Sequence, residues 1–128
     1  MPLTRIDLRR GKSGEFKRTL MNEIYETMRE TFNVPENDRF MVINEHGDDD
    51  FVFDRSYLGI ERSDDFVLIQ ITVSNTRSQE TKQAFYARLV ERLRQRPGLR
   101  SEDVFVNFVE VVKENWSFGN GIAQYVEI

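Results

Sequence analysis

Apolar positions in the first third of the chain change their period twice. Residues 2–8 alternate, which predicts a short strand. From Phe16 to Phe32 the apolar residues recur at helical spacing and predict a helix of about five turns, with Ser13 as its N-cap. Pro35 lies just beyond this helix and prevents its continuation. Residues 40–44 then form a second, strand-like apolar run.

The second half of the chain repeats this order of elements. Residues 66–73 are nearly all apolar, which is typical of a strand buried on both faces. A helix follows, with Thr76 or Ser78 as its N-cap, and residues 104–111 form another apolar strand. The pattern therefore predicts strand, helix and strand in each half.

Shifted by 65 residues, the chain matches itself without a gap. The paired positions are Ile6 with Ile71, Ser13 with Ser78, Leu20 with Phe85, Ile24 with Leu89, Met28 with Leu93, Asp38 with Asp103, and Phe40 with Phe105. The shared phase predicts an α/β (α+β) fold of two β-α-β repeats with right-handed crossovers. The repeats would form one four-stranded mixed sheet with both helices on one face.

We expect a single domain, divided into a first repeat over residues 2–45, a linker over 46–65, a second repeat over 66–112 and a tail over 113–128. The middle of the linker, Phe51-Val52-Phe53, predicts a short strand or a lid. The end of the tail, from Ile122 to Ile128, also predicts a strand, one that pairs with a neighbouring subunit.

Two helices on one face leave the other face of the sheet uncovered. That face still carries apolar residues, and burying them at roughly 25 cal/mol per Å² would strongly favour association. We therefore expect a homo-oligomer whose sheets pack around a symmetry axis.

Composition narrows the function mainly by exclusion. Apolar residues make up 39% and charged residues 31% of the chain, an ordinary globular mixture, and the formal net charge is −4. Neither a nucleic acid nor a membrane is expected as a partner, and the cytoplasm is the default location. There is no Cys, and His46, beside an acidic turn, is the only His, so thiolate chemistry and a His-based triad are excluded. Phosphate-binding glycine loops are also missing.

The first candidate catalytic group is the backbone nitrogen of Pro2. Removal of Met1 before a small residue would leave a free secondary amine, and an α-amino group titrates at about pH 8. Such an amine can act as a base, as an acid or as an iminium-forming nucleophile. If Met1 is retained, this nitrogen is a tertiary amide and has no basic lone pair. Alone, a Met-Pro start is weak evidence of function.

Two charged residues lie at predicted loop positions. Arg77 precedes the second helix, where a guanidinium can bind a carboxylate or an enolate oxygen. Asp38 precedes a strand, where it could activate water or hold the amine, or could simply be a turn carboxylate paired with Arg39. Trp116 and Phe118, in the glycine-containing segment WSFGNG, could form the wall of a small pocket or belong to the core.

Taken together and in this order, these motifs resemble the tautomerase superfamily, specifically its malonate semialdehyde decarboxylase-like branch. The resemblance covers nearly the whole chain and rests on five segments. They are Met1-Pro2-Leu3, residues 35–40 (PENDRF), residues 58–63 (LGIERS), Arg77-Ser78 and residues 116–121 (WSFGNG). The first segment is weak alone, whereas PENDRF and WSFGNG at this spacing are specific.

The resemblance implies a homotrimer with its active site at a subunit boundary. Pro2 would be the catalytic amine, Asp38 would activate water or set the state of the proline, and Arg77 would bind the substrate carboxylate. Trp116, Phe118 and Tyr125 would form an apolar wall, which favours decarboxylation because a carboxylate is destabilised there. No metal or organic cofactor would be needed.

The family pattern differs at one position. The best-known decarboxylases of this branch carry two arginines on the loop, and the first of them corresponds to Asn75 here. Losing a charge-assisted contact removes about 1.5–3 kcal/mol. The resemblance leads us to expect an enzyme that acts on a small oxo acid. It would decarboxylate or hydrate a malonate semialdehyde-like substrate, with keto–enol tautomerisation as a side activity. The alternative is a non-catalytic, ferredoxin-like ligand-binding or scaffold domain in which Pro2 is idle.

Overall fold

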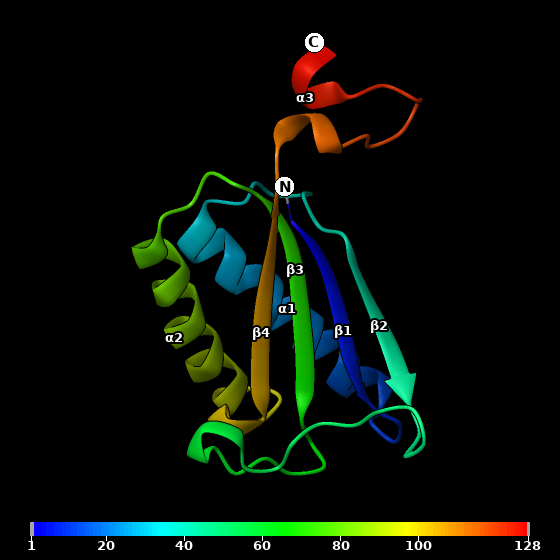
Figure 1. Cartoon of the computed structure of the whole chain (residues 1–128), viewed down its shortest axis with the longest axis vertical. Helices are drawn as coiled ribbons and strands as arrows, with labels where there is room; N and C mark the ends of the chain where they lie inside the picture. Colours follow the sequence, from blue (N-terminus) through cyan, green and yellow to red (C-terminus); the bar gives the residue numbers. More distant parts are fainter. Residues whose placement is uncertain (1, 128) are drawn as a thin grey trace.

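The computed structural model describes residues 2–127, which form one four-stranded sheet with two long helices on one face (Figure 1). The strands lie in the order β2-β1-β3-β4. They are β1 (Leu3–Arg9), β2 (Met41–His46), β3 (Val67–Ser74) and β4 (Val104–Val111). Each repeat contributes a parallel pair, and the two repeats meet along the antiparallel β1–β3 edge. The predicted mixed sheet is confirmed.

Both helices begin at a capping serine. The Ser13 hydroxyl accepts the Phe16 N–H ahead of α1 (Gly14–Phe32). The Ser78 hydroxyl accepts the Thr81 N–H ahead of α2 (Gln79–Gln95), so Ser78 rather than Thr76 is the cap. These bonds satisfy backbone N–H groups that a helix start leaves unpaired.

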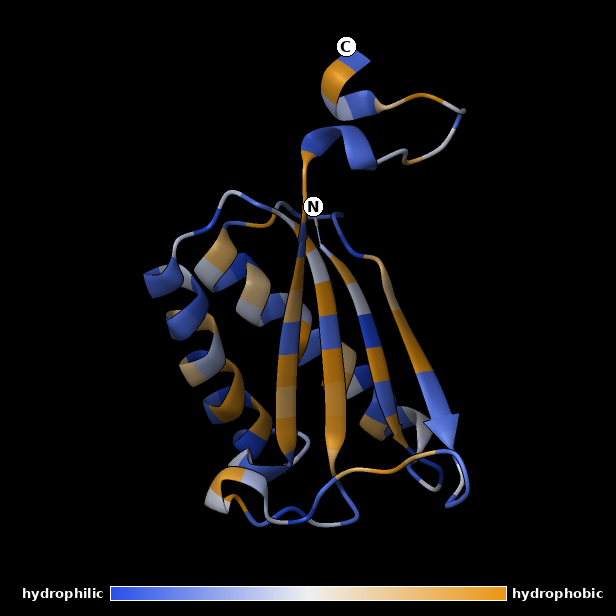
Figure 2. Ribbon diagram, in the orientation of Figure 1, coloured by the Kyte–Doolittle hydropathy of each residue, from blue (hydrophilic) through white to orange (hydrophobic). Residues whose placement is uncertain are grey.

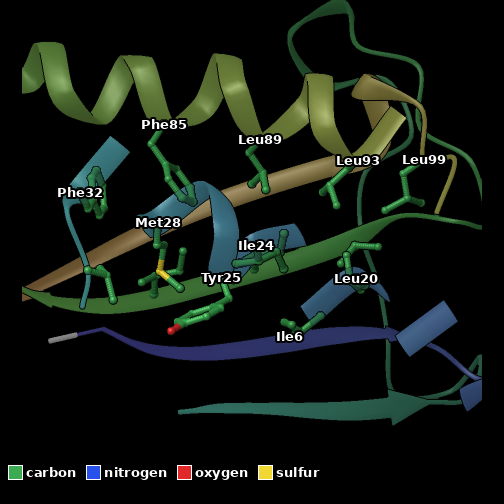
Figure 3. Packing of buried hydrophobic residues seen from close by; sticks show 14 of the residues in the cluster. Ile6, Leu20, Ile24, Tyr25, Met28, Phe32, Phe85, Leu89, Leu93 and Leu99 are labelled. Carbon is green, nitrogen blue, oxygen red and sulfur yellow. The ribbon is translucent and has the colours of Figure 1, made fainter. Parts of the chain in front are cut away.

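The core lies between the sheet and the helices (Figure 3). Apolar and polar residues mix along β1, whereas β3 is largely apolar (Figure 2), and the even-numbered residues of β1 face the helices. Ile6, Ile24 and Leu89 are completely buried there. The buried Glu23 carboxylate on α1 accepts hydrogen bonds from Arg92 and Arg96, which fixes α1 against α2 at their polar edge. Within residues 2–127, neither long helix is apolar enough to cross a membrane.

The outer face of the sheet is more polar than the sequence predicts. Arg5 faces Gln70 across the β1–β3 pair, and the Gln70 amide donates to Asn107 at 3.2 Å. Apolar side chains are also left exposed on this face, among them Val42, which pairs with Arg5, and Phe105. A partner on this face would therefore bury both kinds of surface.

The linker contains no strand at Phe51-Val52-Phe53, so the strand alternative is wrong. The Phe53 ring stacks on Phe66 at 4.3 Å between centroids, whereas the Val52 side chain is 91% exposed. The segment is thus held by aromatic packing and not by ladder hydrogen bonds. Farther on, a short 3-10 turn, η1 (Tyr57–Gly59), is closed by the Arg62 guanidinium, which donates to three backbone carbonyls.

The tail projects beyond the end of the sheet (Figure 1) and ends in a short helix, α3 (Gln124–Glu127). The strand predicted from Ile122 onward is therefore wrong, and its last residue, like Met1, lies outside the described residues. Gly119 and Gly121 have positive φ and turn the chain back. The Gln124 side chain then accepts the Phe118 N–H and donates to the Gly119 carbonyl, which holds the turn closed.

His46 is not in a solvated turn as its acidic neighbours suggest. It is the last residue of β2, partly buried, with Nε2 2.6 Å from an Asp7 carboxylate oxygen. It faces Arg9, at the far end of the sheet from Pro2.

Candidate active site

The strand register gathers three separate segments at the start of β1. Pro2 is buried immediately before this strand. Two residues later, the Thr4 N–H donates to the Phe40 carbonyl at 3.0 Å, and Thr4 faces Ile71 near the end of β3. The loop before β2, which carries Asp38, therefore ends beside the start of β1, and the loop after β3, which carries Arg77, begins there.

Asp38 has one carboxylate oxygen, Oδ1, that is buried and has no hydrogen-bond partner among the described residues. Burial raises the pKa of Asp38, and the positive charge of Arg77 acts in the opposite direction. Buried carboxylate oxygens are nearly always satisfied in folded proteins, so an unpartnered one points to a missing donor such as a ligand, a water or an amine.

The Arg77 guanidinium is half-buried against the end of α1. Its Nη2 donates to the Phe32 carbonyl at 3.3 Å, and its central carbon lies 4.9 Å from the centroid of the Phe32 ring. Burial lowers the pKa of Arg77, whereas Tyr125 and Asp38 raise it. The side chain stays a cation in any case, and most of its five N–H donors remain available to an anion.

Aromatic residues of the tail stand next to these charges. Trp116 Nε1 donates to the Ser74 hydroxyl at 3.2 Å, which ties the tail to the end of β3. Trp116 stacks on Phe118 at 5.5 Å, and Phe118 meets Tyr125 edge-on at 4.9 Å between centroids. A cavity of about 250 Å³ opens under this wall, lined by Leu3, Phe40, Trp116, Ser117 and Phe118.

Tyr125 connects the aromatic wall with the charged pair. Burial raises the pKa of Tyr125, the Asp38 charge raises it further, and the Arg77 charge lowers it. The apolar cavity itself is lined by neither Asp38 nor Arg77. The arrangement is thus an apolar compartment with a cation and a carboxylate at its margin.

Among the described residues, the Asn75 side chain makes no hydrogen bond to the other predicted site residues. Asn75 is exposed in the turn after β3, where its backbone N–H donates to the Val111 carbonyl at 3.1 Å. Leu3 and Phe40 line the cavity without having been singled out individually. The alternation of residues 2–8 places Leu3 on the face opposite the core, and Phe40 ends PENDRF, so these signals could have found both.

The internal repeat supplies a second cavity at the opposite end of the sheet for comparison. It also measures about 250 Å³ and is lined in part by Leu68, Phe105 and Phe53. These residues occupy the repeat positions of Leu3, Phe40 and Phe118. Each cavity is therefore lined by residues of one repeat and by a residue of the segment that follows the other repeat.

The two ends differ in their polar groups. Asp103, at the repeat position of Asp38, is fully buried but accepts two hydrogen bonds from Ser63, at 2.7 and 2.6 Å. Lys12, at the repeat position of Arg77, forms an ion pair with Asp65. Asp103 and Lys12 are already paired, so among residues 2–127 only the Pro2 end keeps a buried carboxylate oxygen without a hydrogen-bond partner. This makes the Pro2 end the better candidate for an active site.

The chain belongs to the tautomerase family. Two family models, each described as a tautomerase enzyme, match residues 38–119 and 2–61. The chain is 39% identical to the probable tautomerase YusQ of Bacillus subtilis (strain 168), over 99% of this chain and 100% of that protein. It is 36% identical to the probable tautomerase YrdN of the same organism, over 98% and 97% of the two chains.

Solved structures refine this assignment. A malonate semialdehyde decarboxylase with decarboxylase and hydratase activities superimposes with a TM-score of 0.90 at 32% identity, over 96% of this chain and 95% of that one. A second one, inhibited by 3-bromopropiolate, gives 0.90 at 35% identity, over 97% and 94%. Both place the chain in the malonate semialdehyde decarboxylase-like branch of the tautomerase superfamily. A fused 4-OT symmetric trimer, 18% identical, shares the fold with a TM-score of 0.78 over 98% and 99%.

Proposed function

We propose that the protein uses the free amine of Pro2 on a small oxo acid, decarboxylating or hydrating a malonate semialdehyde-like substrate, with keto–enol tautomerisation as a side activity. The observation that carries this proposal is the unpartnered, buried carboxylate oxygen of Asp38 beside Arg77 and Pro2. The likeness of the chain to two malonate semialdehyde decarboxylases, at 32% and 35% identity, supports the choice of substrate class.

In this proposal Arg77 binds the substrate carboxylate. Its guanidinium keeps donors free beyond the one bonded to Phe32, and partial burial strengthens each charge-assisted bond. Asn75 carries no charge, so a single cation makes this contact. A substrate with one carboxylate and one carbonyl fits that charge count.

Pro2 supplies the electrophilic assistance. When protonated, its amine donates a proton to the aldehyde oxygen of malonate semialdehyde; when neutral, it can form an iminium with the same carbon and release water. The bond between C2 and the carboxylate then breaks, its electron pair moves toward the activated carbonyl or iminium, and CO₂ leaves. Protonation at C2 converts the enol into acetaldehyde or the enamine into an iminium, and hydrolysis of the iminium releases acetaldehyde and the free amine.

Asp38 acts on the amine or on water. A carboxylate whose pKa is raised by burial is a better base than an exposed aspartate, and its free oxygen can accept a proton from water or a hydrogen bond from the Pro2 ammonium. The wall of Trp116, Phe118 and Tyr125 excludes water around the departing carboxylate. Charge that spreads in the transition state loses less solvation there than a localised carboxylate does.

The site is also proposed to be completed in a homotrimer. The wall residues Phe118 and Tyr125 are 39% and 41% exposed in the single chain, and the tail projects beyond the end of its own sheet (Figure 1). A neighbouring subunit packed on the outer face would cover them. One structural relative, the fused 4-OT, is a symmetric trimer.

Proton NMR of malonate semialdehyde tests the proposed reaction. The protein is first shown by mass spectrometry to lack Met1. We expect acetaldehyde to appear with the intact protein and not with a Pro2→Ala control. If this substrate is untouched while phenylpyruvate enol is still ketonised, the amine works and the substrate class is wrong. If neither substrate reacts, the proposal fails and the result favours the non-catalytic scaffold alternative.

A further inference from the structure

The loop that carries Asp38 is tied to helix α1 by one side chain. Tyr25 lies on α1, is only 6% exposed, and belongs to the hydrophobic core. Figure 3 shows its hydroxyl directed toward the end of the sheet at which β1 begins. A tyrosine in this position needs hydrogen-bond partners for its hydroxyl, and it finds them in the loop.

Both partners belong to the turn that ends at Asp38. The Asp38 N–H donates to the Pro35 carbonyl at 3.2 Å, which closes the turn. The Tyr25 hydroxyl donates to the same carbonyl at 3.4 Å and accepts the Asn37 N–H at 3.1 Å. Asn37 has a φ of 75°, the left-handed conformation that the third residue of a type II turn requires. The hydroxyl thus holds the first and third residues of the turn at once.

We infer that Tyr25 is a positioning residue for Asp38: its hydroxyl fixes the Pro35–Asp38 turn to α1 and thereby sets the direction of the carboxylate in the site. The inference rests on the proposed function, since it gives that site a further residue. The central carbon of the Arg39 guanidinium also lies 4.8 Å from the centroid of the Tyr25 ring. Both chain neighbours of Asp38, Asn37 and Arg39, therefore contact Tyr25.

The variant Tyr25→Phe removes the hydroxyl and keeps the ring in the core. We expect kcat to fall about tenfold, because a catalytic group displaced by a fraction of an ångström loses much of its effect, while KM changes little. Arg77, whose positive charge lowers the pKa of Asp38, and Tyr125, whose own pKa the Asp38 charge raises, are unchanged in this variant.

The pH profile separates a positioning role from a purely structural one. A loosened turn lets water reach the Asp38 carboxylate, and hydration reverses the rise that burial gives its pKa. If activity requires ionised Asp38, the acid limb of the kcat profile therefore moves to lower pH in Tyr25→Phe. A loss of stability alone would leave the limb in place.

Thr27→Val is the matched control on the same helix. Thr27 is completely buried, and its hydroxyl donates to the Glu23 carbonyl at 2.7 Å, away from the loop. The Thr27→Val substitution should lower the melting temperature without altering kcat or the acid limb of the pH profile. If Tyr25→Phe behaves like Thr27→Val while Pro2→Ala is inactive, the inference is wrong and the proposed function stands. If Pro2→Ala retains full turnover, the proposed function itself fails.

Hydrogen exchange in the unchanged protein tests the same contact without a variant. The Asn37 amide should exchange more slowly than the Glu36 amide, because only the former donates to Tyr25. Equal, fast exchange of the two amides would overturn the inference even if Tyr25→Phe did not fold.

Discussion

Replacing Pro2 with alanine is expected to lower kcat/KM by about 10²–10⁴-fold, the usual contribution of a positioned acid–base group. Removal of Met1 from this variant still leaves an α-amine, but a primary one without the fixed ring. The loss should appear mainly in kcat, because Arg77 still binds the substrate carboxylate. Steady-state kinetics on the substrate identified by NMR gives both constants.

The stability of the Pro2→Ala variant is its control. Pro2 is buried before β1 but does not belong to the core cluster that contains Ile6 and Leu8, so the melting temperature should change little. A variant that melts normally and still turns over within a few-fold of the original protein would contradict the role given to Pro2.

Replacing Arg77 with alanine is expected to reduce kcat/KM by about 10–150-fold, the equivalent of a lost charge-assisted contact of ~1.5–3 kcal/mol. Most of the loss should be in KM, since the proposed role is carboxylate binding. Arg77→Lys should recover part of it, because lysine keeps the charge but not the planar fork.

Lys12→Ala is the matched control for Arg77, because Lys12 occupies the same position in the other repeat and is paired with Asp65. It removes a cation from the equivalent loop at the opposite end of the sheet. We expect unchanged kinetics. Equal losses of activity in Lys12→Ala and Arg77→Ala would show that the effect is structural. They would also show that the Pro2 end of the sheet is not the active site.

The fold was predictable because several local signals agree with the global arrangement. The helical spacing from Phe16 to Phe32, the capping serines Ser13 and Ser78, and the 65-residue repeat all specify the same two units. These signals do not specify the edge along which the two parallel pairs join, which in the structure is the antiparallel β1–β3 contact.

The tail was mispredicted because its structure depends on contacts that no periodicity encodes. Alternating apolar residues after Ile122 suggest a strand, but the left-handed backbone at Gly119, Asn120 and Gly121 reverses the chain first. Gln124 then bonds to Phe118 and Gly119, which starts a helix.

The site was predictable only in part, for a similar reason. Asp38 and Asp103 are the same residue at the same repeat position, so the sequence cannot tell which of them is available. The difference comes from Ser63, which lies 40 residues before Asp103 in the chain and satisfies its carboxylate. The importance of Tyr25 is hidden in the same way, since its place in an apolar helical stripe marks it only as a core residue.

The central claim, that a free Pro2 amine does the chemistry, is tested most directly on one unmutated preparation. Protein that retains Met1 is assayed with malonate semialdehyde and with phenylpyruvate enol, treated with methionine aminopeptidase, and assayed again after mass spectrometry confirms the loss of Met1. We predict that turnover appears only after the treatment, because a tertiary amide nitrogen has no basic lone pair. Equal turnover before and after would contradict the account.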